Sequence, residues 1–453
     1  MMDLHLNTER EASIIFPSSM VNDDFTGPIN GYFVANTNIY NIVPLDGSIL
    51  EDRVKRIGYI LSVNPFIFFP ESIQKKIKPY KKTDTTSSAA AILKAVMANT
   101  ADEGLAEHLD IDASIIEKDL IPAVQDNQRD WVKTVLIPTV LNREGNDEIV
   151  GYRENCEIHF VRMKDLVELK PETYALKLDV FSRNTGILES DVMLEKGAIF
   201  IGCGSVGSLV ALELAKSGVG RFFLIDSDIL GYHNLCRHQC GMYDVGRYKT
   251  EALRDRILQI NPYAEVITRN MIIQDVPVDE LYNFCKKDCI FVGGADNREG
   301  DLYANNIAIM ANVPFMSIGC WERAFAGEIF YCLPSGMPTY YDFMVASGNM
   351  SARVSQNRRF YTTEEELEKV SFEPGISADI SFVTIIAVKM AIDLLNRDNL
   401  NYTQRIVPHL TQYTLICNTN NPAIGGEMAE IFSYPLQVTT SIVVPYANKE
   451  ANG

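Results

Sequence analysis

A chain of 453 residues, of which 47% are apolar, is long enough for two or three domains with their own cores. Its formal net charge of -18 disfavours nucleic acid as the main partner, because binding to phosphates needs a positive surface. No apolar run reaches the roughly 18 residues that suggest a membrane span, and residues 1–16 do not resemble a signal peptide. Together with nine scattered cysteines, these features predict a cytoplasmic protein with reduced thiols and no membrane association.

Residues 1–180 are expected to form a separate α+β domain, and none of its residues indicates a particular chemical function. Apolar residues recur at three- and four-residue spacing in two stretches, which predicts helices, and two other stretches are typical of strands. The predicted helices cover 48–62 and 87–99, the predicted strands lie within 30–45 and 155–163, and a turn or loop is expected at 142–148.

Residues 181–453 have a different character, because strands and helices alternate from Gly197 to about residue 333. A buried strand, a glycine-rich turn, an amphipathic helix and a second strand form one βαβ unit of a parallel sheet. The pattern predicts a Rossmann-like, mostly parallel sheet with helices on both faces. Further elements are expected as helices over 249–262, 302–314 and 379–397, strands over 265–272, 289–297 (ending in a turn), 315–320, 411–418, 429–438 and 441–446, and a loop over 346–359.

A Gly-x-Gly-x-x-Gly motif lies between the first strand and helix of this region. Gly202, Gly204 and Gly207 would let a phosphate approach the helix N-terminus, where free N–H groups and the helix dipole favour negative charge. Asp226 ends the next strand, at the position where an acidic residue accepts hydrogen bonds from ribose hydroxyls. The motif alone fits a dehydrogenase equally well, and close packing of a helix on a strand would also explain it.

Five further polar residues distinguish these possibilities. They are Asp228, Asn234, Arg237, Lys249 and Asp296. A dinucleotide needs no such cluster, whereas a triphosphate attacked at its α-phosphorus needs cations on the bridging oxygens and carboxylates that hold magnesium. The alternatives are that the two cations are solvated surface charges and that Asp228 caps a turn.

Taken in chain order, the glycine motif and the polar residues that follow it resemble the motifs of the ThiF/ubiquitin-activating superfamily. The resemblance covers residues 180–400. The family includes adenylyltransferases of thiamine and molybdopterin synthesis. The resemblance implies a nucleotide loop at the three glycines and ribose binding by Asp226. It also implies phosphate contacts from Asn234, Arg237 and Lys249, and magnesium held by Asp296 with help from Asp228.

The segment Phe181-Ser-Arg-Asn is similar to one in which the family supplies an arginine to the partner subunit's ATP site. The resemblance therefore implies a homodimer and a catalytic role for Arg183. Its alternative is an ordinary surface residue. His233 and His238 are expected to be structural, because a carboxylate nucleophile needs no general base.

Two departures from the family concern cysteine. Many members hold zinc with two Cys-x-x-Cys pairs, and this sequence contains no Cys-x-x-Cys, so no structural zinc is expected. Ubiquitin-activating enzymes use a catalytic cysteine about fifty residues after the magnesium-binding aspartate, and no cysteine lies between Leu333 and Ile416 here. Cys332 is the remaining candidate for a thioester.

The favoured function is an ATP- and Mg²⁺-dependent adenylyltransferase that activates the C-terminal carboxylate of a ubiquitin-like protein or peptide. One alternative is an oxidoreductase that uses NAD(P) or FAD, which leaves Arg237, Lys249 and Asp296 unexplained. The other is an ATP-binding scaffold without turnover.

Overall fold

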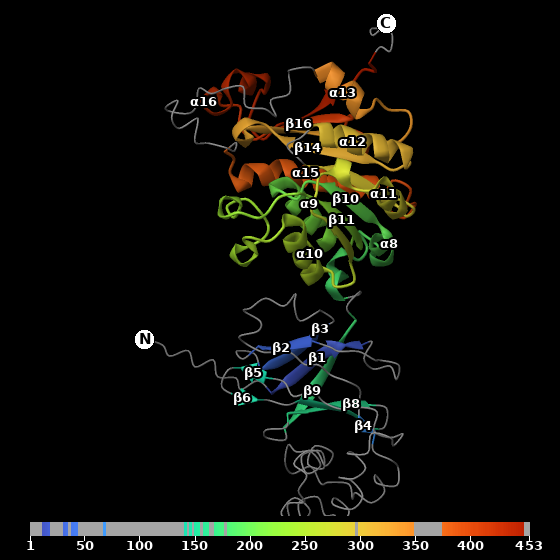
Figure 1. The fold of residues 1–453 in the computed structure, drawn as a ribbon, viewed down its shortest axis with the longest axis vertical. Coiled ribbons are helices and arrows are strands. Elements are labelled where there is room, and N and C mark those ends of the chain that lie inside the picture. Colours follow the sequence, from blue (N-terminus) through green and yellow to red (C-terminus); the bar gives the residue numbers. More distant parts are fainter. Residues whose placement is uncertain are drawn as a thin grey trace, which may run out of the picture. The chain divides into compact units, whose positions relative to one another are not determined.

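The chain divides into two compact units, residues 1–179 and residues 180–453, each with a sheet of its own (Figure 1). The computed structural model describes residues 11–18, 30–34, 38–43, 67–68, 140–142, 145–146, 149–154, 157–162, 167–175, 179–294, 298–347 and 374–447. The helices predicted over 48–62 and 87–99, and residues 348–359 of the predicted loop, lie outside these stretches.

The first unit contains a mixed seven-stranded sheet in the order β2-β3-β1-β9-β8-β7-β4. Its strands are β1 (Ser13–Pro17), β2 (Asn30–Val34), β3 (Ile39–Val43), β4 (Ile67–Phe68), β7 (Ile149–Glu154), β8 (Glu157–Arg162) and β9 (Val167–Tyr174), and a separate pair is formed by β5 (Val140–Asn142) and β6 (Gly145–Asn146). β1 runs parallel to both of its neighbours, β3 and β9. The strands predicted within 30–45 and 155–163 are confirmed, whereas the stretch expected as a turn contains the short strand β6.

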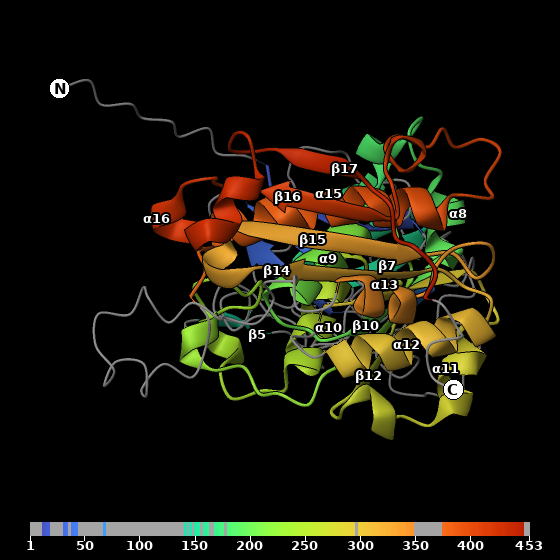
Figure 2. The same cartoon turned by 90° about the horizontal axis from the view of Figure 1, so that it is seen from above.

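The second unit contains an eight-stranded sheet in the order β12-β11-β10-β13-β14-β15-β16-β17. Its strands are β10 (Gly197–Ile201), β11 (Arg221–Ile225), β12 (Glu265–Arg269), β13 (Cys289–Gly293), β14 (Phe315–Cys320), β15 (Ala326–Cys332), β16 (Tyr413–Cys417) and β17 (Val438–Ile442). The strands from β10 to β14 are mutually parallel, and β15, β16 and β17 extend the sheet in antiparallel fashion. Figure 2 shows β14, β15, β16 and β17 following one another across it.

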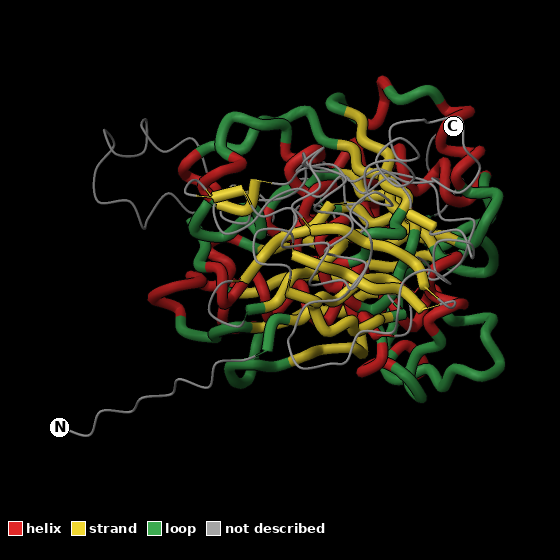
Figure 3. The backbone as a smooth tube through the Cα atoms, turned by 90° about the horizontal axis from the view of Figure 1, so that it is seen from below, coloured by secondary structure: helices red, strands yellow, loops and turns green. Residues whose placement is uncertain are grey.

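Helices cover both faces of this sheet, as predicted (Figure 3). The helices are α8 (Ser190–Glu195), α9 (Ser205–Lys216), α10 (Lys249–Ile260), α11 (Val278–Phe284), α12 (Arg298–Met310), α13 (Tyr340–Ser347), α15 (Ser377–Leu395) and α16 (Pro422–Gly425). Alternate strand residues enter two separate cores, because successive side chains of a strand point to opposite faces. Phe200 and Phe222 pack with α9, α10 and α15, whereas Phe223 and Phe291 pack with α11 and α12.

The parallel half of the sheet confirms the strands and helices predicted from Gly197 to Cys320, and it also contains α11, which was not predicted. The alternation then stops earlier than expected, because β14 and β15 form a hairpin through a 3₁₀ turn at Glu322–Ala324. The strand predicted over 429–438 is wrong. Gly426–Ile431 is a 3₁₀ helix, Pro435 has no amide hydrogen for a ladder, and Leu436 has a φ of +57°. The last strand, predicted over 441–446, instead ends at Ile442.

Within the described stretches, no helix combines the length and the apolar character that crossing a membrane requires.

Candidate functional site

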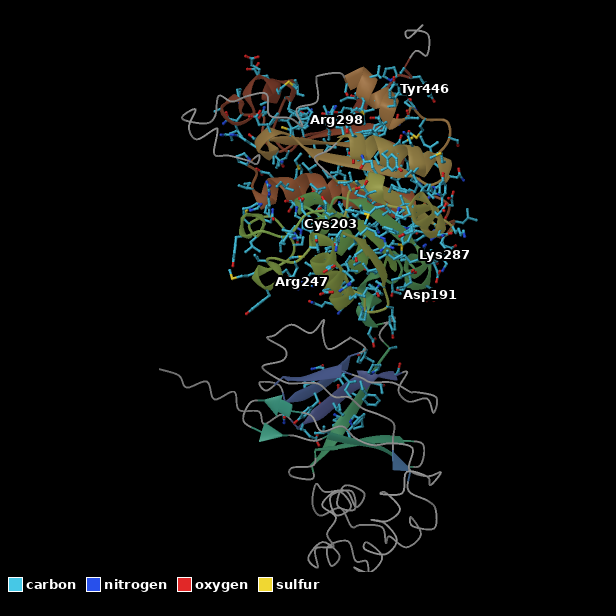
Figure 4. The ribbon with its side chains drawn as sticks, in the orientation of Figure 1. Asp191, Cys203, Arg247, Lys287, Arg298 and Tyr446 are labelled. Carbon is cyan, nitrogen blue, oxygen red and sulfur yellow. The ribbon has the colours of Figure 1, made fainter. Side chains whose placement is uncertain are left out.

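The turn between β10 and α9 carries the three glycines of the predicted nucleotide loop, and Figure 4 labels Cys203 within it. Gly202 has a φ of +93°, which glycine adopts without steric cost. A Cβ on Gly207 would lie 2.0 Å from the carbonyl oxygen of Gly202, so only glycine fits there. A Cβ on Gly204 would meet nothing within 4 Å. The loop therefore leaves open space at a helix N-terminus, which is where phosphates bind favourably.

Asp226 directly follows β11 and ties the glycine loop to the next turn. Its Oδ2 accepts the amide hydrogen of Cys203 at 2.7 Å, and its Oδ1 accepts that of Asp228 at 2.8 Å. Each carboxylate oxygen can accept more than one hydrogen bond, so both oxygens retain capacity for hydroxyl hydrogens. Asp226 therefore lies beside the loop, where the ribose of a bound nucleotide would need it.

A buried histidine supports the same loop from the other side. His238 Nδ1 accepts the amide hydrogen of Cys240 at 3.0 Å, so the neutral ring carries its proton on Nε2 and donates to the carbonyl of Cys203 at 2.7 Å. Burial is the main cause that lowers the pKa of His238, while the bond to Cys203 acts in the opposite direction. The sequence suggested a structural role for His238 but did not reveal that its partner is the carbonyl of Cys203.

An ion pair joins the end of β11 to the start of α10. Nζ of Lys249 lies 2.7 Å from Oδ2 of Asp228, and the amide of Lys249 donates to the carbonyl of Asp228 at 3.0 Å. The lysine side chain is only 10% exposed, whereas the aspartate side chain is 66% exposed. The lysine is therefore held in place, while the carboxylate faces solvent and can exchange its partner.

The segment between these two residues carries Asn234 and Arg237. Asn234 ends the 3₁₀ helix Tyr232–Asn234, and its Oδ1 accepts the amide hydrogen of Gly231 at 2.8 Å. Its carbonyl accepts the amide hydrogen of Arg237 at 3.0 Å. The next residue, His238, is bonded to the glycine loop. The half-buried Arg237 is therefore carried by a turn that is anchored beside that loop.

The end of β13 is the remaining side of the site. The amide of Gly294 donates to the carbonyl of Ile201 at 2.9 Å, which places this strand end next to the glycine loop. Asp296 itself lies outside the described residues. Across the parts of the chain that are described, no three His, Cys, Asp or Glu side chains converge as metal ligands. Magnesium binding by Asp296 and Asp228 stays a prediction, as does the expectation of no zinc.

The two outlying candidates lie in different places. Arg183 is an exposed residue in the 3₁₀ turn Ser182–Asn184, ahead of the sheet. Cys332 is buried and pairs with Phe315, the first residue of β14. It therefore lies at the amino-terminal ends of the parallel strands, whereas the glycine loop lies at their carboxyl ends. Burial also raises the pKa of its thiol. This position and this pKa argue against a thioester at Cys332.

A buried polar cluster in the antiparallel half was not singled out from the sequence. Glu328, on β15, is only 1% exposed, and its Oε2 accepts hydrogen bonds from Trp321 Nε1 at 3.1 Å and from the Tyr413 hydroxyl at 2.8 Å. Its Oε1 lies 3.9 Å from Nη2 of Arg298, which begins α12 and is labelled in Figure 4. A single acid inside the apolar segment 326–332 was the available signal.

Comparison with known proteins agrees with this arrangement. The profile of the ThiF family matches residues 183–424, more than half of the chain, and the match begins at Arg183. It therefore covers the glycine loop, the segment from Asp226 to Lys249 and the end of β13.

Several curated proteins are similar over part of this region. A probable adenylyltransferase/sulfurtransferase, MoeZ, of Mycobacterium tuberculosis is 31% identical over 119 residues, which cover 26% of this chain and 30% of MoeZ. The ThiS adenylyltransferase of Bacillus subtilis is 30% identical over 147 residues, 32% of this chain and 42% of that protein. The matches thus span less than half the length of these relatives. Among solved structures, E. coli MccB with AMPCPP and MccA aligns with 57% of this chain and 67% of its own, at 18% identity and a TM-score of 0.41.

Proposed function

Because the chain belongs to the ThiF family, we propose that it is an ATP-dependent adenylyltransferase that activates the C-terminal carboxylate of a ubiquitin-like protein or peptide in the cytoplasm. The observation that carries the proposal is that hydrogen bonds connect the turns at the carboxyl ends of β10, β11 and β13. There an open glycine loop, the Asp226 carboxylate and the buried Lys249 lie on adjoining turns. An oxidoreductase would not use the lysine.

In the proposed reaction, a substrate carboxylate oxygen attacks the α-phosphorus of ATP. A carboxyl–phosphate bond forms, the bond from the α-phosphorus to the bridging oxygen breaks, and pyrophosphate leaves with that electron pair. Lys249 and Arg237 would stabilise the negative charge that grows on the phosphate oxygens. Asp296 and Asp228 would hold the magnesium ion that neutralises the triphosphate.

The geometry of the described residues fits a nucleotide in three respects. A Cβ on Gly204 would meet nothing within 4 Å, so the backbone there is open to an approaching phosphate. The Asp226 oxygens can accept ribose hydroxyls in addition to their backbone amides. Lys249 is paired with an exposed carboxylate, so a phosphate can share or replace that partner without unpacking the lysine stem.

ATP–pyrophosphate exchange, with candidate carrier proteins or peptides as substrate, tests the proposal. We expect Lys249→Ala and Asp296→Ala each to lower exchange by about a hundred-fold or more, because each removes a contact to charge that develops in the transition state. Lys216→Ala is the matched control, since this lysine ends α9 with a side chain that is 56% exposed and forms an ion pair with Glu213. Near wild-type exchange in Lys249→Ala would remove that residue from the site.

We also propose a homodimer in which Arg183 reaches the partner's site. The segment that carries Asn234 and Arg237 exposes Tyr232, Met242 and Tyr243 by 72%, 68% and 75%, and such apolar side chains are suited to an interface. If sites are shared, mixing inactive Arg183→Ala with inactive Asp296→Ala should restore part of the activity. Subunit exchange without any recovery would show that each subunit is self-sufficient.

We further propose that this chain stops at the acyl adenylate or passes it to a nucleophile on another molecule. The buried Cys332, with its raised pKa, supports this, because the thiolate is the reactive form of cysteine. A non-reducing gel of enzyme, ATP and substrate should show no adduct that reductant cleaves. An adduct that disappears in Cys332→Ala would instead establish a thioester enzyme.

A further inference from the structure

His238 joins two segments that both belong to the proposed phosphate site. The first is the glycine loop, in which Figure 4 labels Cys203, and the second is the turn that carries Arg237. His238 is only 7% exposed, and its ring nitrogens have different partners. Nε2 donates to the carbonyl of Cys203 at 2.7 Å, and Nδ1 accepts the amide hydrogen of Cys240 at 3.0 Å. One buried ring is therefore bonded to both segments.

The bond to Cys203 also sets the direction of the next amide in the glycine loop. The carbonyl of Cys203 and the N–H of Gly204 belong to one planar, trans peptide unit, so they point in opposite directions. Because the carbonyl points at His238, the Gly204 amide points away from the buried ring. A Cβ on Gly204 would meet nothing within 4 Å, so the backbone there is open to an approaching ligand. This amide is therefore available to a phosphate at the start of α9.

The other contacts of His238 hold the turn beside it. Its own amide and that of Arg237 both donate to the carbonyl of Asn234, at 2.8 Å and 3.0 Å. The ring bond to Cys240 then fixes the chain on the following side. The half-buried Arg237 directly precedes a residue whose amide and ring are both bonded. The place of Arg237 relative to the glycine loop therefore depends on the His238 ring.

We propose that His238 is a positioning residue for phosphate binding, which holds the Gly204 amide and Arg237 in fixed places so that both contact one triphosphate. The inference rests on the proposed function of the site. The ring itself does not touch the nucleotide, and it transfers no proton, because both of its nitrogens already have partners. It has to be neutral with its proton on Nε2, since Nδ1 must accept and Nε2 must donate.

Two substitutions separate the two ring bonds. In asparagine the side-chain oxygen is attached to Cγ, as Nδ1 is in histidine, so His238→Asn can keep the Cys240 amide but does not reach Cys203. In glutamine the amide nitrogen lies beyond Cδ, at the level of Nε2, so His238→Gln can keep the bond to the glycine loop. Each variant keeps one of the two hydrogen bonds, so both should lose similar stability in urea denaturation. They should differ in phosphate binding.

Isothermal titration calorimetry with ATP and Mg²⁺, and separately with adenosine, measures this difference. We expect His238→Asn to weaken ATP binding about ten-fold, the scale of one hydrogen bond to a charged group, and to leave the affinity for adenosine unchanged because adenosine has no phosphate. His238→Gln should stay within about three-fold of the wild type for ATP. His233→Asn, at an exposed histidine of the same turn, is the matched control and should bind both ligands as the wild type does.

A double-mutant cycle tests whether His238 acts through Arg237. In an Arg237→Ala background, His238→Asn should weaken ATP binding by a smaller factor than it does in the wild type, because the guanidinium that it positions has been removed. Nitrogen NMR of the unsubstituted protein gives a test that needs no variant. The His238 ring should be neutral and carry its proton on Nε2.

The inference is overturned if His238→Asn and His238→Gln weaken ATP binding equally, or if His238→Asn weakens adenosine binding as much as ATP binding. Fully additive effects with Arg237→Ala, or a ring that carries its proton on Nδ1, would also overturn it. A wild-type protein that binds no ATP would refute the proposed function together with this inference. ATP binding that is normal in both the wild type and His238→Asn would refute only the role of His238.

Discussion

The parallel and antiparallel halves of the eight-stranded sheet differ in the contacts that hold the turns on the side of the glycine loop. The parallel half relies on main-chain atoms. The amide of Gly202 donates to the carbonyl of Ile225, and that of Gly294 donates to the carbonyl of Ile201. Where a carboxylate takes part, as at Asp226, it accepts backbone amides. This half leaves open space at a helix N-terminus, which suits a large anionic ligand.

The antiparallel half relies on buried side chains. Arg323 and Ala324, in the β14–β15 turn, have φ values of +55° and +54°, which are strained for residues other than glycine. Asn418 Nδ2 donates to the carbonyl of Ala324 at 2.6 Å and helps to hold this turn. Glu328 accepts hydrogen bonds from Trp321 and Tyr413 and lies opposite the guanidinium of Arg298. These networks fill space, where the parallel half leaves it open.

This difference decides how each half should respond to substitution. In the parallel half, where main-chain atoms form the contacts, an added side chain should destabilise the fold through steric overlap. Where buried polar side chains form the contacts, the loss of a hydrogen-bonding atom does the damage, because buried groups left without partners are costly.

The largest effect is expected for Gly207→Ala in the parallel half. The new Cβ would lie 2.0 Å from the carbonyl oxygen of Gly202, and backbone has to move to relieve the contact. We expect a loss of about 3 kcal/mol in the free energy of unfolding, at the upper end of typical overpacking costs. Urea denaturation measures it, and nucleotide binding should be lost as well.

Gly204→Ala in the same loop is the matched control. Its Cβ would meet nothing within 4 Å, and its backbone conformation is open to other residues, so we expect a loss of about 1 kcal/mol or less from a weaker helix cap. ATP affinity should nevertheless fall, because the methyl group would occupy the space proposed for a phosphate. Equal destabilisation by the two variants would contradict the steric account of this half.

A smaller effect is expected for Glu328→Gln in the antiparallel half. The amide oxygen can still accept both hydrogen bonds that Oε2 accepts from Trp321 and Tyr413, but the substitution places an NH₂ group or a neutral oxygen opposite Arg298 and removes the negative charge that faces it. We expect a loss of about 2 kcal/mol, in the range of hydrogen bonds to charged groups. Tyr413→Phe, which removes one donor and keeps the carboxylate, should cost less. A reversed order would mean that the charge itself does not stabilise this half.

The same contrast explains what could be predicted from the sequence. An apolar strand, a glycine motif and an amphipathic helix are local signals, and they predicted β10, α9 and β11 with the position of Asp226. The bond from His238 to Cys203 could not be predicted, because it joins residues that are 35 positions apart. The 429–438 stretch misled because its apolar residues suggest a strand, while Pro435 and the left-handed Leu436 prevent one. Asp296 remains a prediction from its motif.

The smallest predicted effect concerns the exception to this contrast, the His238 side chain that supports the main-chain loop. Burial lowers the pKa of His238 below its ordinary value of 6.5. The unfolded chain therefore takes up a proton at a higher pH than the folded protein does. The stability that His238 contributes is present above about pH 6.5 and is lost as the pH falls from there toward the lowered pKa. Between about pH 7.5 and 5.5, we expect the wild type to lose more stability than His238→Gln, which does not titrate. Urea denaturation at both pH values measures the difference. Parallel pH profiles for the two proteins would mean that folding leaves the pKa of His238 unchanged, and would contradict a ring held neutral by burial.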